Sequence, residues 1–463
     1  MQKKALNHLE IRSPYSGEIA GTVRLASQED VNRVVDTAAA YKSGLSRYEL
    51  RQVLQQASQL LTARQEIAAA LIVSESGLSY RDALYEVGRV CDVLQWSAIE
   101  ATREDGQIFP CDVTAAGHQR KVISYRVPLD GVIVAITPFN HPMNQVAHKV
   151  GPAIATNNRI VVKPSEKVPL SALFLADLLY EAGLPREMFQ VLTGEPHEIV
   201  TALLRHPSVE LVAFTGGVEI GKMLASKIGY RRIVLELGGN DPLIVMEDAD
   251  LERSAQLAVD GSYANSGQRC TAVKRVLVHA AVSRRFTEIV VEKTIRRSYG
   301  NPSDPAVQMG TVIDSRAAGH IKCRVDAAIA NGARLLTGNH VDGALFAPTV
   351  LDQVTPDMEL VQQETFGPVT PIMTFSSIDE AIGIANGTRF GLSAGVCTDR
   401  LDYVTRFAKE LRVGTLNVWE VPGFRTELTP FGGTKDSGLG LKEGVLESAR
   451  NYTVAKTLSL PWM

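Results

Sequence analysis

The chain has 463 residues, of which 45% are hydrophobic and 21% are charged, and its formal net charge is −3. A chain of this length and composition is expected to fold into two or three globular domains with large cores. The near-neutral charge argues against binding to nucleic acid or to an anionic membrane surface. The sequence contains no run of about 18 apolar residues, so we expect no membrane-spanning segment.

The cysteines are odd in number, scattered along the chain and without a CxxC pair. They are Cys91, Cys111, Cys270, Cys323 and Cys397. This pattern favours a reducing compartment and argues against a disulfide framework and a structural zinc site. Residues 1–5 lead into polar sequence, which predicts no secretory leader. We therefore expect a cytoplasmic protein, and no required metal, because the histidines also lack metal-ligand spacing.

The region up to residue 101 is predicted to be mostly helical after a short segment of turns and strands. Ser27 begins a capped helix, and apolar residues at helical spacing continue through residues 31–101. Arg89 lies in the last of these helices. From the local sequence it is either an exposed charge or the partner of Glu86 in an ion pair.

Residues 111–128 are predicted to form a two-stranded hairpin around a turn at Gly117. Residues 451–460 alternate like an edge strand and are expected to pair with this hairpin. A two-stranded ribbon is only marginally stable by itself. We therefore expect the ribbon to pack on another subunit, which predicts a homodimer or a homotetramer.

Two runs of alternating strands and helices make up the rest of the chain. In the first run, apolar strands are expected at residues 131–137, 159–162, 189–192, 211–214 and 233–237. The second run extends from about residue 241 to residue 431. This alternation predicts the α/β class, with parallel sheets that bind ligands at the carboxyl ends of their strands.

The predicted organisation is two Rossmann-like domains and an oligomerisation element. We assign residues 1–110 and 129–238 to a cofactor-binding domain and residues 239–431 to a catalytic domain. The oligomerisation ribbon comprises residues 111–128 and 446–463.

One cysteine stands in a sequence that suits a nucleophile. Cys270 follows Arg269 in the stretch Ser-Gly-Gln-Arg-Cys-Thr-Ala, and Glu236 ends an apolar strand before two glycines. A thiol nucleophile needs a lowered pKa, a base for the later attack of water, and an oxyanion donor. We expect Arg269 to supply positive potential and Glu236 to supply the base. A small buried hydrophobe is the competing interpretation of Cys270, and these residues alone favour it.

Three local features suit a dinucleotide, and each has a plain structural alternative. Gly216, Gly217 and Gly221 surround a strand-to-helix turn where backbone N–H groups can approach a pyrophosphate, or where the backbone simply needs glycine. Lys163 and Glu166 can bind a ribose, or they belong to an ordinary helix start. Glu364 and Phe366 can hold the nicotinamide riboside, or they form a loop before a Gly-Pro turn. No single feature decides between these readings.

Taken together, six motifs resemble the aldehyde dehydrogenase superfamily in their order and approximate spacing. They are Phe139-Asn140, Lys163-Pro164-Ser165-Glu166, Phe214-Thr215-Gly216-Gly217, Glu236-Leu237-Gly238-Gly239, Gly267-Gln268-Arg269-Cys270 and Glu364-Thr365-Phe366-Gly367-Pro368. The resemblance covers almost the whole chain. Phe139 departs mildly from the pattern, because many members have tryptophan before the asparagine.

The resemblance implies a mechanism. Cys270 attacks the aldehyde carbonyl, and the oxyanion is stabilised by the Asn140 side-chain amide and the Cys270 backbone N–H. A hydride passes to the nicotinamide and leaves a thioester, which water activated by Glu236 hydrolyses.

The resemblance also implies a set of cofactor contacts. They are Thr137, Pro138, Phe139, Lys163, Ser165, Glu166, Thr215, Gly216, Gly217, Gly221, Leu237, Glu364 and Phe366. Because the Glu166 carboxylate would repel a 2′-phosphate, we expect NAD as the cofactor, with NADP possible but less favoured.

Four stretches resemble the phosphonoacetaldehyde dehydrogenases of this superfamily. They are residues 74–78, 84–94, 140–149 and 428–433. By motif, the residues that would hold the phosphonate are Arg89, His141, Arg269 and Arg425. Guanidinium groups match phosphonate, phosphate or carboxylate oxygens as a bidentate fork. We therefore expect NAD-dependent oxidation of phosphonoacetaldehyde to phosphonoacetate, as a step of phosphonate catabolism.

Other functions remain open from the sequence. One is non-phosphorylating oxidation of glyceraldehyde 3-phosphate, and another is oxidation of lactaldehyde or a similar short aldehyde. A non-catalytic protein on the same scaffold would be expected to lack Cys270 or Glu236, and both are present.

Overall fold

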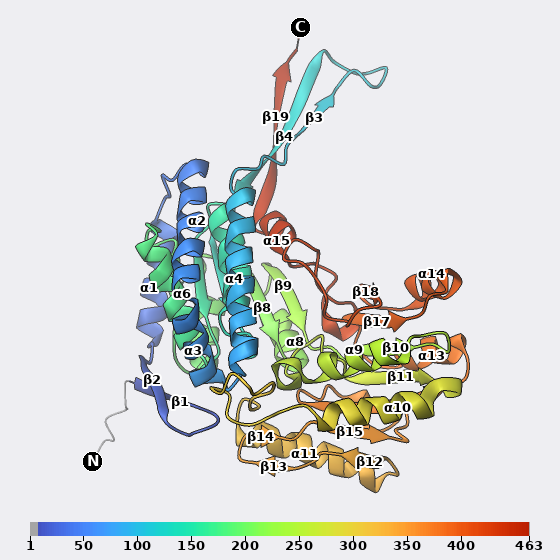
Figure 1. Cartoon of the computed structure of the whole chain (residues 1–463). Helices are drawn as coiled ribbons and strands as arrows, with labels where there is room; N and C mark the ends of the chain where they lie inside the picture. The colour runs from blue at the N-terminus through green and yellow to red at the C-terminus, as the bar shows by residue number, and fades with distance from the viewer. Residues whose placement is uncertain (1–7, 463) are drawn as a thin grey trace.

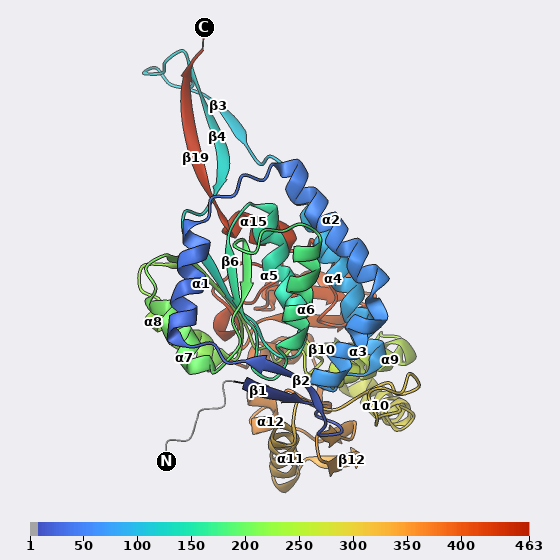
Figure 2. The ribbon, with the colours of Figure 1, turned by 90° about the vertical axis from the view of Figure 1, so that its left-hand side faces the viewer.

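The computed structural model of the chain describes residues 8–462, which form two largely parallel sheets and a three-stranded ribbon (Figure 1). Residues 1–5, where we expect no leader, lie outside the described residues, as does Met463. The ribbon projects away from the body that contains the two sheets, and both views show this (Figures 1 and 2). The predicted α/β class with parallel sheets is confirmed.

The N-terminal segment is a short hairpin followed by four helices. The Ser27 side chain accepts a hydrogen bond from the Asp30 backbone N–H, and the Asp30 carboxylate accepts one from the Ser27 N–H. This capping box begins the first helix at the predicted position. The elements are β1 His8–Arg12, β2 Ile19–Arg24, α1 Gln28–Ala40, α2 Arg47–Ala63, α3 Gln65–Ser76 and α4 Tyr80–Glu100.

The first sheet has five parallel strands in the order β7-β6-β5-β8-β9. All five of its strands were predicted from the sequence, but helix α7 was not. The elements are β5 Val132–Ile136, α5 Asn144–Ala155, β6 Ile160–Lys163, α6 Leu170–Glu181, β7 Phe189–Val191, α7 Pro196–Arg205, β8 Val209–Gly216, α8 Val218–Lys227 and β9 Arg232–Leu237.

Helices cover both faces of this sheet, and the alternation of side chains along β5 shows how. Ile133 and Ala135 pack into the core formed with helices α2 to α6. Val132 and Val134 pack into the core formed with α1, α7 and α8. Because neither face meets water, every residue of β5 is apolar and buried.

The second sheet has seven strands in the order β12-β15-β16-β11-β10-β17-β18, and only β12 is antiparallel to its neighbour. Strand β10, at Pro242–Val245, and strands β12 and β15 were not predicted, nor was helix α13. The elements are β10 Pro242–Val245, α9 Leu251–Tyr263, η1 Ala264–Gly267, β11 Arg275–His279, α10 Ala280–Ile295, α11 Ser315–Ala330, β12 Arg334–Thr337, β13 Val341–Asp342, β14 Leu345–Phe346, β15 Thr349–Asp352, α12 Glu359–Gln362, β16 Val369–Phe375, α13 Ile378–Asn386, β17 Ser393–Cys397, α14 Leu401–Glu410, β18 Thr415–Val418 and η2 Lys435–Ser437.

The ribbon consists of β3 Gln107–Pro110, β4 Arg120–Pro128 and β19 Thr453–Pro461. The C-terminal strand pairs with β4 along its whole length, as predicted. The hairpin differs from the prediction, because its first strand precedes residue 111 and residues 111–119 only connect the two strands. Helix α15, at Val445–Asn451, packs on α4 and α5, so the C-terminal part of the ribbon begins at Thr453 and not at residue 446.

Candidate active site

A cavity of about 270 Å³ lies where helix α4, the loop after β5, the turn after α9 and the loop after β18 meet. The structure brings Cys270 and Asn140 together on its wall with all four residues predicted to hold the substrate. The lining residues are Asp82, Tyr85, Arg89, Asn140, His141, Gln145, Ala264, Asn265, Arg269, Cys270, Thr271, Glu420, Val421, Gly423, Phe424, Arg425 and Phe431.

The turn that carries Cys270 has an unusual backbone. Asn265, Ser266 and Gly267 all have positive φ angles, of 59°, 54° and 70°. A Cβ atom at Gly267 would lie 2.2 Å from the Gly367 carbonyl oxygen, so only glycine fits there. The next residue, Gln268, accepts a hydrogen bond from the Ile313 N–H at 2.8 Å. These contacts hold the thiol at the cavity wall.

The thiol of Cys270 is not activated in the way that the sequence suggested. The side chain is partly open to the cavity but lies deep in the protein. Desolvation, together with the negative charges of Asp241 and Glu364, raises the pKa of Cys270 to about 12. Arg425 and Lys274 oppose this rise without cancelling it. The positive charge of Arg269, which the sequence suggested would lower the pKa of the thiol, is therefore outweighed by burial.

Glu236 lies at the end of β9 and is almost completely buried, and neither of its carboxylate oxygens has a hydrogen-bond partner. Burial, and secondarily the charge of Glu443, raises the pKa of Glu236 well above its ordinary value. Such a carboxyl can act as a base near neutral pH. Glu236 does not line the thiol cavity; it lies behind the wall, against Gly432, whose neighbour Phe431 is part of that wall.

Two buried charged residues near Glu236, Lys149 and Glu443, were not predicted from the sequence. Lys149 on α5 donates to the Glu443 carboxylate at 2.6 Å and to the Thr215 hydroxyl at 2.8 Å. The Lys149 side chain is completely buried in a helix whose residues are all buried. A lysine in so apolar a helix was the available signal, because a buried lysine requires a partner.

Arg89 has a different partner from the one that the local sequence suggested. Its guanidinium forms two bonds with the Glu427 carboxylate, at 2.6 Å and 3.1 Å, and His148 Nε2 lies 2.5 Å from the same carboxylate. Burial alone would raise the pKa of Glu427, but His148 and Arg89 outweigh it and hold that pKa well below its usual range. Glu86 instead accepts hydrogen bonds from the first N–H groups around α5 and contacts His141 at 3.3 Å.

Two further guanidinium groups on the wall retain unpaired nitrogen atoms. Arg269 donates through Nη2 to the Gly261 carbonyl at 2.9 Å, while its Nε is buried without a partner. Arg425 stacks over the Phe431 ring at 3.9 Å, and its Nη1 is buried without a partner. Buried N–H donors are costly when unpaired. Because both residues line the cavity, an anionic ligand there would meet two guanidinium groups.

A second cavity, of about 690 Å³, lies at the carboxyl ends of β5, β6 and β8. It is lined by many of the residues predicted to bind the cofactor, namely Thr137, Pro138, Phe139, Lys163, Ser165, Glu166, Thr215, Gly216 and Gly217. Helix α7, which was not predicted, adds His197 and Arg205 to the wall.

The remaining predicted cofactor residues lie outside the wall of this cavity. A Cβ atom at Gly221 would lie 2.4 Å from the Leu237 side chain, so this glycine serves the packing of α8 on β9. Glu364 accepts a hydrogen bond from the Gly239 N–H at 3.2 Å and lies 3.7 Å from Lys274 Nζ. Phe366 meets the Phe139 ring edge-on, with 5.8 Å between the ring centroids.

The second cavity fits a dinucleotide. Helix α8 begins beside it without a side-chain cap, so its first N–H groups are available to a pyrophosphate. A Cβ atom at Gly217 would meet nothing within 4 Å, which leaves room for a ligand to approach the backbone. Lys163 is buried, its Nζ lies 3.4 Å from the Glu166 carboxylate, and both residues line this cavity.

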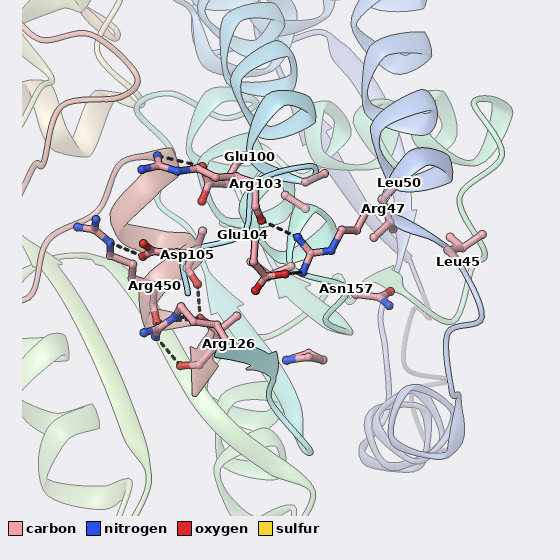
Figure 3. Close-up of a pocket in the computed structure, with 16 residues that line it drawn as sticks. Leu45, Arg47, Leu50, Glu100, Arg103, Glu104, Asp105, Arg126, Asn157 and Arg450 are labelled. Carbon is pink, nitrogen blue, oxygen red and sulfur yellow. Dashed lines mark hydrogen bonds and ion pairs between the residues drawn. The ribbon is translucent and has the colours of Figure 1, made fainter. Parts of the chain in front are cut away.

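A third cavity, of about 200 Å³, lies at the base of the ribbon (Figure 3). Its arginines are engaged within the chain. Arg47 donates to the Arg103 carbonyl at 2.7 Å, and Arg126 donates to the Arg450 carbonyl at 2.6 Å. Arg450 lies 3.6 Å from Asp105. The charged residues around this cavity therefore connect α2, the end of α4 and the base of the ribbon.

Residues 8–462 contain neither a candidate membrane span nor a candidate metal cluster. Within this range, no helix is both long enough and apolar enough to cross a bilayer, and no cluster of three His, Cys, Asp or Glu side chains could hold a metal ion.

A thiol cavity beside a dinucleotide-sized cavity on a two-sheet scaffold fits the class of cysteine-dependent oxidoreductases. Comparison with known proteins makes the assignment. The sequence profile of the aldehyde dehydrogenase family matches residues 1–458. The chain belongs to the aldehyde dehydrogenase family, and it is an NAD(P)-dependent aldehyde dehydrogenase.

Individual relatives match over most of their length. The 3-sulfolactaldehyde dehydrogenase of Priestia aryabhattai is 40% identical over 453 residues, which cover 98% of this chain and 94% of the relative. The sulfoacetaldehyde dehydrogenase of Neptuniibacter caesariensis is 40% identical over 407 residues, 88% of each chain. A crystal structure of the NADP-dependent glyceraldehyde-3-phosphate dehydrogenase of Bacillus halodurans with NADP is similar with a TM-score of 0.94, at 35% identity, and covers 99% of this chain and 96% of that one.

Proposed function

We propose that this enzyme oxidises phosphonoacetaldehyde to phosphonoacetate with NAD, through a thioester on Cys270, in phosphonate catabolism. The observation that carries the proposal is the pair of buried guanidinium groups on the wall of the thiol cavity, Arg269 and Arg425, each with an unpaired nitrogen. An uncharged aldehyde would offer these guanidinium groups no anionic partner. A phosphonate at the far end of a two-carbon aldehyde would satisfy them.

The residues of the chain divide the chemistry between them. The Cys270 thiol first loses its proton to solvent, and the resulting thiolate attacks the carbonyl carbon. The Asn140 amide and the Cys270 N–H stabilise the oxyanion that forms. When bound, the dinucleotide supplies the hydride acceptor. Glu236, with its raised pKa, takes a proton from the water that hydrolyses the thioester. Because Glu236 lies behind the wall at Gly432, this step requires it to reach the thiol cavity by a side-chain movement or through a water molecule.

A sulfonate is the second candidate for the head group, because the two relatives named above act on sulfolactaldehyde and sulfoacetaldehyde. Charge favours the phosphonate. Arg89 is neutralised by Glu427, but Arg269 and Arg425 are not paired with a carboxylate in the structure, and two positive charges suit a dianion better than a monoanion. A phosphonate gains its second charge near neutral pH, so its KM should fall as pH rises from 6 to 8, whereas the KM of a sulfonate should stay level.

The preference for NAD is part of the proposal. The Glu166 carboxylate beside Lys163 would accept a hydrogen bond from a ribose 2′-OH and repel a 2′-phosphate. His197 and Arg205 in the same cavity would favour the phosphate instead, so the ratio of kcat/KM with the two cofactors measures which charges prevail. A preference for NADP would reject this part of the proposal.

Oligomerisation through the ribbon is also proposed. The ribbon exposes the apolar side chains of Ile108, Phe109 and Leu458, and the residues next to its strands expose those of Val113 and Trp462. Such a surface is typical of a contact between subunits, here in a homodimer or a homotetramer. Analytical ultracentrifugation should show one of these two species, and a monomer at micromolar concentration would contradict the proposal.

The assignment of chain segments follows from the same proposal. Residues 1–110 and 129–238, apart from ribbon strand β3, form the proposed cofactor-binding domain, and residues 239–431 form the proposed catalytic domain with the nucleophile. All five cysteines are free thiols in the structure, which supports residence in a reducing compartment such as the cytoplasm.

The substrate is tested by following NADH absorbance with several aldehydes in parallel. They are phosphonoacetaldehyde, sulfoacetaldehyde, glyceraldehyde 3-phosphate, lactaldehyde and acetaldehyde. The proposal predicts the highest kcat/KM for phosphonoacetaldehyde. It is wrong if acetaldehyde is oxidised as efficiently. A Cys270→Ser variant should lose turnover while retaining NAD binding, which shows that the rate belongs to this thiol.

A further inference from the structure

The turn before Cys270 keeps a backbone that ordinary residues avoid. Asn265 and Ser266 are both left-handed although neither is glycine. Asparagine tolerates this region better than most residues, but a strained turn persists only where surrounding contacts hold it. The contacts of Asn265 therefore show what fixes the turn.

Asn265 is held by two other segments of the chain and by its own turn. Its backbone N–H donates to the Asp82 carboxylate at 3.0 Å, near the start of helix α4. Its side-chain Nδ2 donates to the backbone carbonyl of Asn140 at 2.8 Å and to that of Gln268 at 3.2 Å. The residue is 3% exposed, so water does not compete for these bonds. Both amide hydrogens of the side chain are thus used.

Asp82 is itself a fixed anchor. It accepts a hydrogen bond from the Ser79 hydroxyl at 2.9 Å, and the Ser79 side chain caps the first turn of α4. Burial raises the pKa of Asp82, while the bonds from Ser79 and Asn265 favour its charged form. The hydrogen bond between Asn265 and Asp82 therefore joins helix α4 to the turn that carries Cys270.

We propose that Asn265 is a positioning residue that fixes the oxyanion donor Asn140 relative to the Cys270 thiol. The inference rests on the roles of these two residues in the proposed function. Donors in an oxyanion hole act only within about 0.5 Å of their correct place. Asn265 bonds the backbone of Asn140 directly and also belongs to the Cys270 turn, so it sets the distance between them.

The matched variants are Asn265→Gly and Asn339→Gly. Glycine keeps a left-handed backbone in both cases, but only the first removes the bond to Asn140. Asn339 has a φ of 60° and donates instead to Asp326, away from both cavities. Asn265→Gly should lower kcat by about 10- to 100-fold, because losing an oxyanion donor outright costs about 10²- to 10³-fold. Asn339→Gly should leave kcat unchanged.

A double-mutant cycle separates positioning from a general structural role. The cycle measures kcat for Asn265→Gly, for Asn140→Ala and for the two together. If Asn265 acts by placing the Asn140 amide, its loss should have no further effect once that amide is gone. The inference is overturned if Asn265→Gly lowers kcat equally in the wild type and in the Asn140→Ala variant. It is also overturned if Asn265→Gly changes only KM, because the unpaired Asn265 Oδ1 would then contact the substrate.

The same cycle tests the proposed function separately. If Asn140→Ala alone leaves kcat unchanged, Asn140 is not the oxyanion donor, and that part of the proposed function fails. If Asn140→Ala lowers kcat but Asn265→Gly does not, only the positioning role fails. Cofactor affinity, measured by fluorescence titration, should stay within about twofold in all variants if they are folded.

Discussion

Replacing Arg269 with alanine should lower kcat/KM far more for an anionic aldehyde than for an uncharged one. Arg269 lines the thiol cavity, so a phosphonate bound there would supply an anionic partner for its guanidinium group. A charge-assisted hydrogen bond contributes about 1.5–3 kcal/mol. Because about 1.4 kcal/mol corresponds to a tenfold change, kcat/KM for phosphonoacetaldehyde should fall roughly 10- to 150-fold.

The assay compares this loss with the loss for propionaldehyde, which has no head group to bind. For propionaldehyde the change should be less than about threefold. Arg269→Lys keeps the charge but not the planar fork, so its kcat/KM for the phosphonate should lie between those of the wild type and the alanine variant. An equal loss for both aldehydes would refute the reasoning, because Arg269 would then act on the neighbouring thiol and not on the substrate.

Three other predictions concern the base, the thiol and a buried ion pair. Glu236→Gln should stop the enzyme at the thioester. Stopped-flow measurements should then show a burst of about one NADH per active site, followed by little turnover. Steady turnover without a burst would exclude Glu236 as the base. Because the pKa of Cys270 is raised to about 12, its alkylation by iodoacetamide without cofactor should accelerate about tenfold per pH unit from pH 7 to 10. A plateau near pH 7 would mean that the thiol is already ionised. Glu427→Ala should lower the free energy of unfolding in urea by about 3–5 kcal/mol, since it leaves the charge of Arg89 buried and unpaired. The exposed control Glu410→Ala, which breaks a surface ion pair with Arg406, should lower the free energy of unfolding far less. Similar losses for both variants would show that the buried pair contributes little.

Elements with a clear period could be predicted from the sequence. The capped start at Ser27 and the apolar strand at Val132–Ile136 follow from local rules. Helix Pro196–Arg205 was overlooked because it is short and lies close between two strands. The four residues of Pro242–Val245 form a central strand, but so short an apolar run does not by itself distinguish strand from buried helix or loop.

Site residues could be named where a motif carried them, but their partners could not. Arg89 and Glu427 are 338 residues apart, and no local pattern joins them. The raised pKa of Cys270 could not be predicted from the sequence either. The direction of its shift depends mainly on burial and on the charges of Asp241 and Glu364, which local sequence does not show. Local sequence therefore indicates which groups are present, while the fold decides which charges they meet.

The most direct test of the account compares phosphonoacetaldehyde with its neutral dimethyl phosphonate ester, which has the same carbon skeleton and no charge. If Arg269 and Arg425 each make a charge-assisted contact to the head group, kcat/KM should be at least about 100-fold higher for the charged aldehyde. Equal kcat/KM values for the two compounds would contradict recognition of the substrate through its negative charge.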